Sequence, residues 1–158
     1  MTVTILVMRR GVTLTGQRLR DCHDRLDIVA EDASRVLWRS ATPSGDIEGS
    51  TDKLGDEWTY RYKDIHCSKQ KVTELVPGKR VAWHVLDGYL DFVENKEEWT
   101  GTDITFDITN RGDKTDVRFT HLGLVPDFEC FDNCSNAWGF YINGSLRSLI
   151  STGEGQPN

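Results

Sequence analysis

The stretch PDFECFDNCSNAWGFYINGSLRSLISTG, residues 126–153, decides the fold because it has the pattern of a long amphipathic helix. Its apolar residues recur at intervals of three and four, which places them on one side of an α-helix. At ~1.5 Å per residue, roughly 26 helical residues would span about 39 Å and cross a small domain. The apolar positions are Phe131, Cys134, Trp138, Tyr141, Ile142, Leu149 and Ile150, with Leu146 one position off the ideal stripe. Such a helix needs a broad apolar surface to pack against.

The ends and the glycines of this helix lead to further expectations. Asp127 or Asp132 is expected to cap the first turn, and Gly153 is placed to end the helix. Gly139 and Gly144 each cost roughly 1 kcal/mol relative to alanine in a helix interior. Two reasons for these glycines remain open: the close approach of another backbone, or a local bend.

Before the helix, apolar residues alternate with polar ones, and this period of two predicts strands of an antiparallel sheet. We expect strands at 57–63, 65–76, 80–86, 98–109 and 115–124. Tight turns are expected at 76–79, where Pro77 and Gly78 suit a type II turn, and at 110–113. The alternation directs inward the side chains of Trp58, Tyr60, Tyr62, Ile104, Phe106, Ile108, Val117, Phe119 and His121. Residues 80–86 carry apolar side chains on both faces, so their inward face stays open.

The remaining segments have weaker patterns. Residues 2–8 suit a strand, 17–26 have some helical character, and 25–31 suit an edge strand. Asp32 suits the N-cap of a short helix through Ser40. A loop is expected at 41–55, with one short strand at 47–50. Residues 87–96 form a longer apolar connection, which is either a satellite cluster beneath a loop or a lid over a cavity.

Composition and charge exclude several classes of protein. With 37% apolar and 28% charged residues in 158, the chain has the composition of a single folded domain. A net charge of −6 without a clustered basic face argues against a nucleic-acid partner. No apolar run reaches the ~20 residues of a membrane span, and Arg9 and Arg10 follow the first apolar run, unlike in a secretion signal. We expect a cytoplasmic protein whose four cysteines are free thiols.

Five segments then appear in a characteristic order: IEGSTDKLGDEWTYRYKD (47–64), KVTELVPGKRVAW (71–83), EWTGTDITFDI (98–108), TDVRFTHLGLVP (115–126) and NAWGFYINGSLRSLISTG (136–153). Together they resemble the START-like (SRPBCC) superfamily, in particular the bacterial branch named for its similarity to the activator of the heat-shock protein 90 ATPase. The resemblance covers residues 47–158. It implies an α+β, helix-grip fold, in which a curved antiparallel β-sheet wraps around a long C-terminal α-helix. Residues 1–24 are then an atypical N-terminal segment, and 25–158 form one START-like domain.

Proteins of this superfamily bind or transform apolar small molecules in a cavity between sheet and helix, and the resemblance implies such a cavity here. The inward aromatic residues suit either simple core packing or the wall of such a pocket with a few polar anchors. The candidate ligand-binding residues are Trp58, Tyr60, Tyr62, Trp83, Phe106, Phe119, His121, Trp138 and Tyr141.

His121 has three interpretations at this point. It shares strand parity with Val117 and Phe119, and therefore should face the helix. A buried histidine there is a hydrogen-bonded core residue, a ligand anchor, or a general acid/base tuned by burial. No serine, cysteine or carboxylate has a spacing that would complete a nucleophilic triad.

Other polar clusters give no recognisable site. Cys130 and Cys134 share a helix face, but nothing supplies the two further ligands of a structural zinc site. His66 and Cys67 are adjacent in a strand and point to opposite faces. We therefore expect neither a metal nor a cofactor. The acidic group Glu94, Glu97 and Glu98 is expected to be a solvated edge.

Three functions follow from these observations. The leading hypothesis is a non-catalytic carrier or sensor that holds a small apolar molecule between the sheet and the helix. The second is an enzyme of the cyclase or hydrolase kind that uses His121 as acid/base. The third, which rests on family analogy alone, is a chaperone partner that acts on heat-shock protein 90.

Overall fold

The computed structural model describes residues 1–8, 45–111 and 114–152. These residues form a seven-stranded sheet in which every neighbouring pair of strands is antiparallel, in the order β1-β7-β6-β5-β4-β3-β2. The strands are β1 (Thr2–Met8), β2 (Asp46–Gly49), β3 (Glu57–Tyr62), β4 (His66–Val76), β5 (Arg80–Leu90), β6 (Asp103–Arg111) and β7 (Lys114–Leu122). The strand expected at residues 2–8 is therefore confirmed, and it pairs with β7 at one edge of the sheet.

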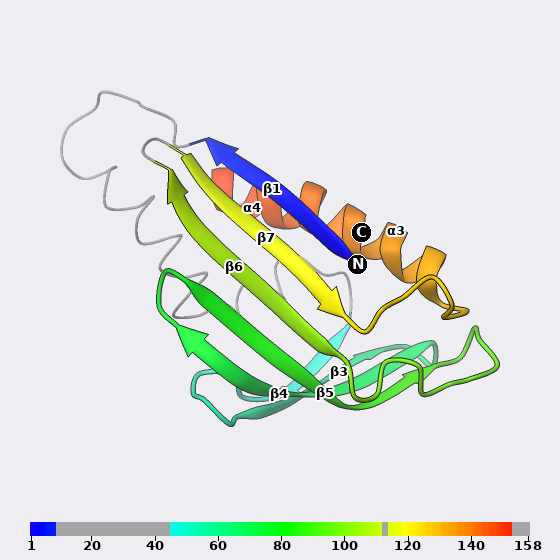
Figure 1. Cartoon of the computed structure of the whole chain (residues 1–158). Coiled ribbons are helices and arrows are strands. Elements are labelled where there is room, and N and C mark those ends of the chain that lie inside the picture. Colours follow the sequence, from blue (N-terminus) through cyan, green and yellow to red (C-terminus); the bar gives the residue numbers. More distant parts are fainter. Residues whose placement is uncertain (9–44, 112–113, 153–158) are drawn as a thin grey trace.

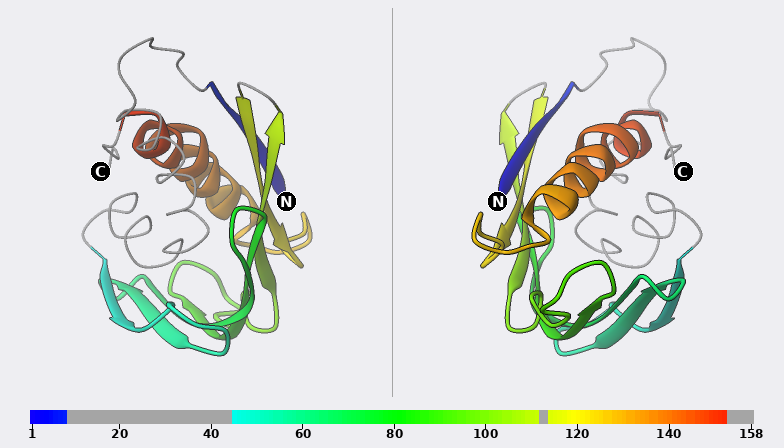
Figure 2. Two further views of the ribbon diagram at one scale, coloured as in Figure 1. Left: turned by 90° about the vertical axis from the view of Figure 1, so that its left-hand side faces the viewer. Right: turned by 90° about the vertical axis from the view of Figure 1, so that its right-hand side faces the viewer.

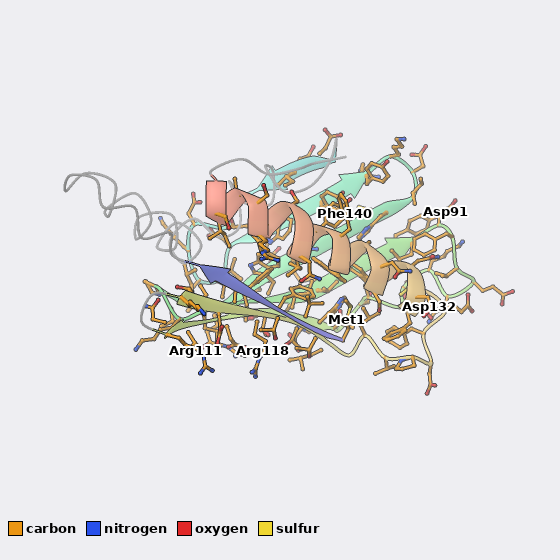
Figure 3. All side chains as sticks on the ribbon, turned by 90° about the horizontal axis from the view of Figure 1, so that it is seen from above. Met1, Asp91, Arg111, Arg118, Asp132 and Phe140 are labelled. Atoms are coloured by element: carbon orange, nitrogen blue, oxygen red, sulfur yellow. The ribbon has the colours of Figure 1, made fainter. Side chains whose placement is uncertain are left out.

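The sheet curves around the C-terminal helix. Figure 1 shows β1, β7 and β6 running past one side of the helix, and the end-on views in Figure 2 show β3, β4 and β5 turning beneath it. The side chains of Arg111 and Arg118 extend from the sheet away from the helix (Figure 3), so this part of the outer face carries charged groups. This arrangement confirms the α+β, helix-grip architecture.

The helix is one rod of three consecutive segments: α3 (Phe131–Phe140), the π-helical η1 (Tyr141–Leu146) and α4 (Arg147–Thr152). It begins at Phe131, the first apolar position of the pattern and later than a helix capped by Asp127 would begin. Residues 126–130 form turns in which the Phe131 N–H donates to the Phe128 carbonyl, at 3.1 Å. The expected end at Gly153 lies outside the described residues. No described helix has the length and hydropathy to cross a membrane.

Two irregularities in the pairing of β4 with β5 bend the sheet and settle the inward face of β5. Thr73 in β4 and Leu86 in β5 are each skipped in the register, as in a β-bulge. Before its bulge, β5 directs Val81, Trp83 and Val85 to the helix side, opposite inward residues of β4 and β6. Each bulge shifts the alternation by one residue, and this shift adds local twist to the strands.

Several expected boundaries need correction. Residues 87–90 continue β5 instead of opening a loop, and β6 begins at Asp103 instead of Glu98. The short strand expected at 47–50 is β2, and the turn at 76–79 is confirmed, with Gly78 at φ +65°. The segments expected at 17–26, 25–31 and 32–40 lie outside the described residues.

Candidate functional site: an aromatic cavity beneath the helix

A cavity of about 260 Å³ lies between the inner face of the sheet and α3. Its wall combines strands β3, β4, β5 and β6, the 91–102 loop and the first turns of the helix. Six of the nine candidate residues line it: Trp58, Tyr60, Tyr62, Trp83, Trp138 and Tyr141. Strand alternation explains the first three, because β3 presents every second side chain to the same face.

Phe106 and Phe119, two further candidates, pack behind this wall and are not among its lining residues. The ring of Phe106 lies 5.2 Å from that of Trp83, and the ring of Phe119 lies 4.4 Å from that of Trp138. Both are almost fully buried. They support the cavity residues by core packing, which was the simpler of the two interpretations.

His121, the ninth candidate, is fully buried in β7 and is likewise not among the lining residues. The Trp138 Nε1–H donates to its Nδ1 at 3.2 Å, so Nδ1 is an acceptor and the proton belongs on Nε2. Nε2 then donates to Thr102 Oγ1 at 2.9 Å, and that hydroxyl donates to the Trp99 carbonyl. Burial lowers the pKa of His121 to about 3, which keeps the ring neutral.

A polar strip on the inner face of β4 escaped the sequence analysis. His66, Ser68 and Gln70 occupy alternate positions, and all three line the cavity. The Gln70 side-chain amide donates to Ser68 Oγ at 2.8 Å, and His66 Nε2 lies 3.1 Å from the same oxygen. The sequence held one signal for this strip. Val72 is an apolar residue with the same strand parity as 66, 68 and 70, and its burial places these three residues on the inward face.

The 91–102 loop also contributes more than the sequence indicated. Trp99 is buried at the centre of the aromatic cluster: its ring lies 4.6 Å from that of His66, 4.8 Å from that of His121 and 5.9 Å from that of Trp138. A Cβ at Gly88 would lie 2.9 Å from the Trp99 Cβ, so a glycine in β5 makes room for the loop. Leu90 and Phe92 line the cavity, which places the start of this loop in its wall.

Three tyrosines from two elements line the cavity. Tyr60 and Tyr62 come from β3, and Tyr141 comes from the helix. Burial, followed by the proximity of the other tyrosines, raises the pKa of Tyr60, and burial raises the pKa of Tyr141. Both phenols are therefore neutral at physiological pH.

None of the described residues that line the cavity is an aspartate, glutamate, lysine or arginine. Burial lowers the pKa of His66 to about 4, so the one lining histidine is uncharged at neutral pH. The described part of the cavity wall is therefore apolar with neutral hydrogen-bonding groups, and these residues offer no opposite charge to a bound ion.

The two helix cysteines lie at the same end of the cavity. Cys134 lines the wall and Cys130 is fully buried; both are free thiols. A hydrogen bond between the two thiols raises the pKa of Cys130 and lowers that of Cys134. Beneath them, the Glu98 carboxylate accepts the backbone N–H groups of Glu129 and Cys130, at 2.8 and 2.9 Å. The expectation that Glu98 is solvated is therefore wrong, because the start of the helix covers it.

Comparisons with known structures identify this architecture. The chain is similar to the Aha1 dimer from Colwellia psychrerythraea, with 20% identity over 98% of this chain and 99% of that one, and a TM-score of 0.62. It is also similar to Mll3558 from Rhizobium loti (12% identity, 90% and 92% of the chains, TM-score 0.59). A third similar structure is DynU16 of the dynemicin biosynthetic locus (12% identity, TM-score 0.59). The match covers 99% of this chain but 49% of DynU16.

No protein-family model matches the sequence, and no curated protein sequence matches it. The structural likeness therefore shows the class of fold: the chain has a START-like, helix-grip fold. Within that class it is similar in architecture to the bacterial Aha1 homologue.

Proposed function

We propose that this protein binds a small apolar molecule in the cavity, as a carrier or sensor that does not transform it. The observation that carries this proposal is the cavity of about 260 Å³ between sheet and helix, with a mainly aromatic wall. Small-molecule sites typically combine an apolar body with a few polar groups that orient the ligand. The proposed ligand contacts are Trp58, Tyr60, Tyr62, Trp83, Trp138 and Tyr141.

The surroundings of the cavity provide a route for such a molecule. Ile65, in the turn between β3 and β4, and Phe92, at the start of the 91–102 loop, line the cavity and are 42% and 44% exposed. Apolar side chains that reach from the wall to the surface favour the transfer of an apolar ligand, because they contact it before it is fully buried.

The two other hypotheses have less support. An enzyme that uses His121 would need a free ring nitrogen in the cavity, whereas Trp138 and Thr102 occupy both nitrogens. For the chaperone partner, the likeness to Aha1 is a likeness of fold at 20% identity, and fold alone does not fix function. Neither alternative has an observation that favours it over ligand binding.

The proposal predicts saturable binding of a neutral apolar probe. N-phenyl-1-naphthylamine should gain fluorescence on titration with the full chain, at one site per molecule. A saturating ligand should also raise the free energy of unfolding, by about 2.7 kcal/mol at a hundredfold excess over Kd. Thermal or urea unfolding with and without the probe measures this stabilisation.

A matched pair of helix variants locates the binding site. Ala137 lines the cavity while remaining exposed, so Ala137→Trp fills the cavity from the helix side without disturbing the core. Asn136→Trp adds the same ring at the adjacent exposed position, which does not line the cavity. We expect Ala137→Trp to weaken probe binding at least about tenfold, a loss of ~1.4 kcal/mol, and Asn136→Trp to leave it unchanged. Equal binding by both variants, or no binding by the wild type, would contradict the proposal.

A further inference from the structure

Two buried polar atoms in the cavity wall have no hydrogen-bond partner among the described residues. They are the indole Nε1 of Trp58 and the side-chain Oε1 of Gln70. Both residues line the cavity, and they are 2% and 3% exposed. Buried polar groups are almost always hydrogen-bonded, so two unpaired ones beside a cavity indicate the atoms that a bound molecule would satisfy.

The two atoms belong to neighbouring side chains of opposite hydrogen-bonding character. Trp58 in β3 lies directly opposite Gln70 in β4, so their side chains leave the same face of the sheet side by side. The amide nitrogen of Gln70 donates to Ser68 Oγ, which leaves its oxygen as the unpaired acceptor. The indole N–H of Trp58 is a donor only. A single hydroxyl group can satisfy both, because it donates one hydrogen and accepts another.

The rest of the wall favours an aromatic and uncharged partner for this pair. The rings of Trp58 and Trp83 meet edge to face, with centroids 5.2 Å apart, beside the Gln70 position. No described lining residue carries a charge that would balance a carboxylate or an ammonium group. A cavity of about 150 Å³ holds benzene, and the present one, of about 260 Å³, has room for a second fused ring.

We infer that the cavity selects uncharged aromatic molecules of about two fused rings that carry a hydroxyl group. The ligand hydroxyl donates to Gln70 Oε1 and accepts from the Trp58 Nε1–H, while its rings lie against the tryptophans. This inference rests on the proposed function, and it adds the chemical class of the ligand.

A series of four compounds on one ring system tests the inference with the full chain at pH 7, by isothermal titration calorimetry. The probes are 2-naphthol, 2-methoxynaphthalene, naphthalene and 2-naphthoate. The methoxy oxygen accepts but cannot donate, naphthalene does neither, and naphthoate is an anion. We expect 2-naphthol to bind roughly tenfold more tightly than 2-methoxynaphthalene, since one buried hydrogen bond separates them. 2-Naphthoate should bind most weakly, because its charge would be buried without a partner.

Two variants assign the two hydrogen bonds. Gln70→Leu removes the acceptor, and should bring the affinity for 2-naphthol down to that for 2-methoxynaphthalene. Trp58→Phe removes the donor but keeps a ring, and should weaken the two oxygen-bearing probes by a larger factor than naphthalene, which loses only part of its ring contact. As a control, Lys69→Leu places leucine on the outer, exposed face of the same strand and should change none of the affinities.

The outcomes separate this inference from the proposed function. Equal binding of 2-naphthol, 2-methoxynaphthalene and naphthalene would overturn the hydroxyl selection and leave apolar binding intact. Tighter binding of 2-naphthoate than of the other three probes would also overturn the hydroxyl selection. If none of the four binds while N-phenyl-1-naphthylamine does, the hydroxyarene class is wrong; if no probe binds, the proposed function fails with it. If Gln70→Leu does not fold, the inference is tested by Trp58→Phe and by the affinities of the wild type for the four probes.

Discussion

Glu98 is a buried carboxylate that holds the start of the helix in place. Burial alone would raise its pKa, but the backbone N–H groups of Glu129 and Cys130 outweigh this effect and lower it. The carboxylate thereby serves as the cap that Asp127 or Asp132 was expected to provide, and no side chain at the N-cap residue itself makes such a bond. A negative charge here also suits the positive end of the helix dipole. Figure 3 shows Asp91, at the start of the same loop, at the same end of the molecule as Asp132.

Replacement of Glu98 should therefore destabilise the fold. We expect Glu98→Ala to lower the free energy of unfolding by about 2 kcal/mol, because two buried N–H groups lose a charged acceptor. The neighbouring Glu97 is exposed, and Glu97→Ala should change stability by less than about 0.5 kcal/mol. Urea denaturation of the two variants measures the difference. Equal losses would show that the carboxylate has no special role.

At the scale of the element, the π-helical segment explains how the rod keeps one face on the sheet. Its buried apolar residues, Cys134, Trp138, Ile142, Leu146 and Ile150, are four apart throughout. In an α-helix, each four-residue step overshoots a full turn by about 40°, so the stripe would drift around the rod. The i→i+5 bonding of η1 widens the turn, and this returns Leu146 and Ile150 to the buried side.

The surroundings of Gly139 and Gly144 argue against one of the two reasons for the helix glycines. A Cβ added at Gly139 or Gly144 would meet no described atom within 4 Å, so a close approach to another described backbone is not the reason. The irregularity lies instead in the π-helical turn that contains Gly144.

The open space at Gly139 leads to a stability prediction. Gly139→Ala should raise the free energy of unfolding by about 0.5–1 kcal/mol, because alanine loses less backbone entropy on helix formation. Gly49 in β2 is the contrasting case: its φ is +100°, and a Cβ would lie 2.4 Å from the Glu57 carbonyl oxygen. Gly49→Ala should therefore lower stability by more than about 1 kcal/mol. Chemical denaturation measures both, and a loss of stability in Gly139→Ala would contradict the first expectation.

At the scale of the whole molecule, two neutral histidines, the buried His121 and the half-buried His66, link stability to pH. The pKa of His66 is lowered to about 4 and that of His121 to about 3, both by burial, from an ordinary value of 6.5. Between the folded-state pKa values and 6.5, the unfolded chain binds protons on these two histidines that the folded chain does not. The stability that these two histidines contribute is therefore fully present above the unfolded-state pKa of 6.5 and is lost as the pH decreases toward the folded-state values.

The fall in the free energy of unfolding with decreasing pH has an expected size, which can be measured directly. Between pH 7 and 5.5, each histidine should lower the free energy of unfolding by about 1 kcal/mol, or about 2 kcal/mol together. In His121→Gln or His66→Gln, the fall should shrink to about half, whatever the stability of the variant at pH 7. Urea midpoints at the two pH values test this prediction. An undiminished fall in both variants would assign the pH dependence to other groups.

The elements of this fold and part of the cavity wall could be predicted from local patterns. The alternation in β3 and β7 placed Trp58, Tyr60 and His121 on the inner face, and the helix period placed Trp138 opposite them. These predictions succeeded because strand and helix periods depend on residues that are close neighbours along the chain.

Other features depend on residues that are distant in the chain and meet only after folding. Glu98 contacts a helix that begins more than thirty residues later, and the bulge at Leu86 exists only in register with β4. The polar strip of β4 lies beside Trp58 only because β3 and β4 pair. The Gln70 oxygen can be recognised as unpaired only once its neighbours in the folded molecule are known. Short-range periodicity thus specified the helix, the strands and their inward aromatic residues, whereas long-range packing determined the cap, the curvature and the polar groups of the cavity. The physical reason is that burial and hydrogen-bond pairing are properties of the assembled molecule and of no single segment.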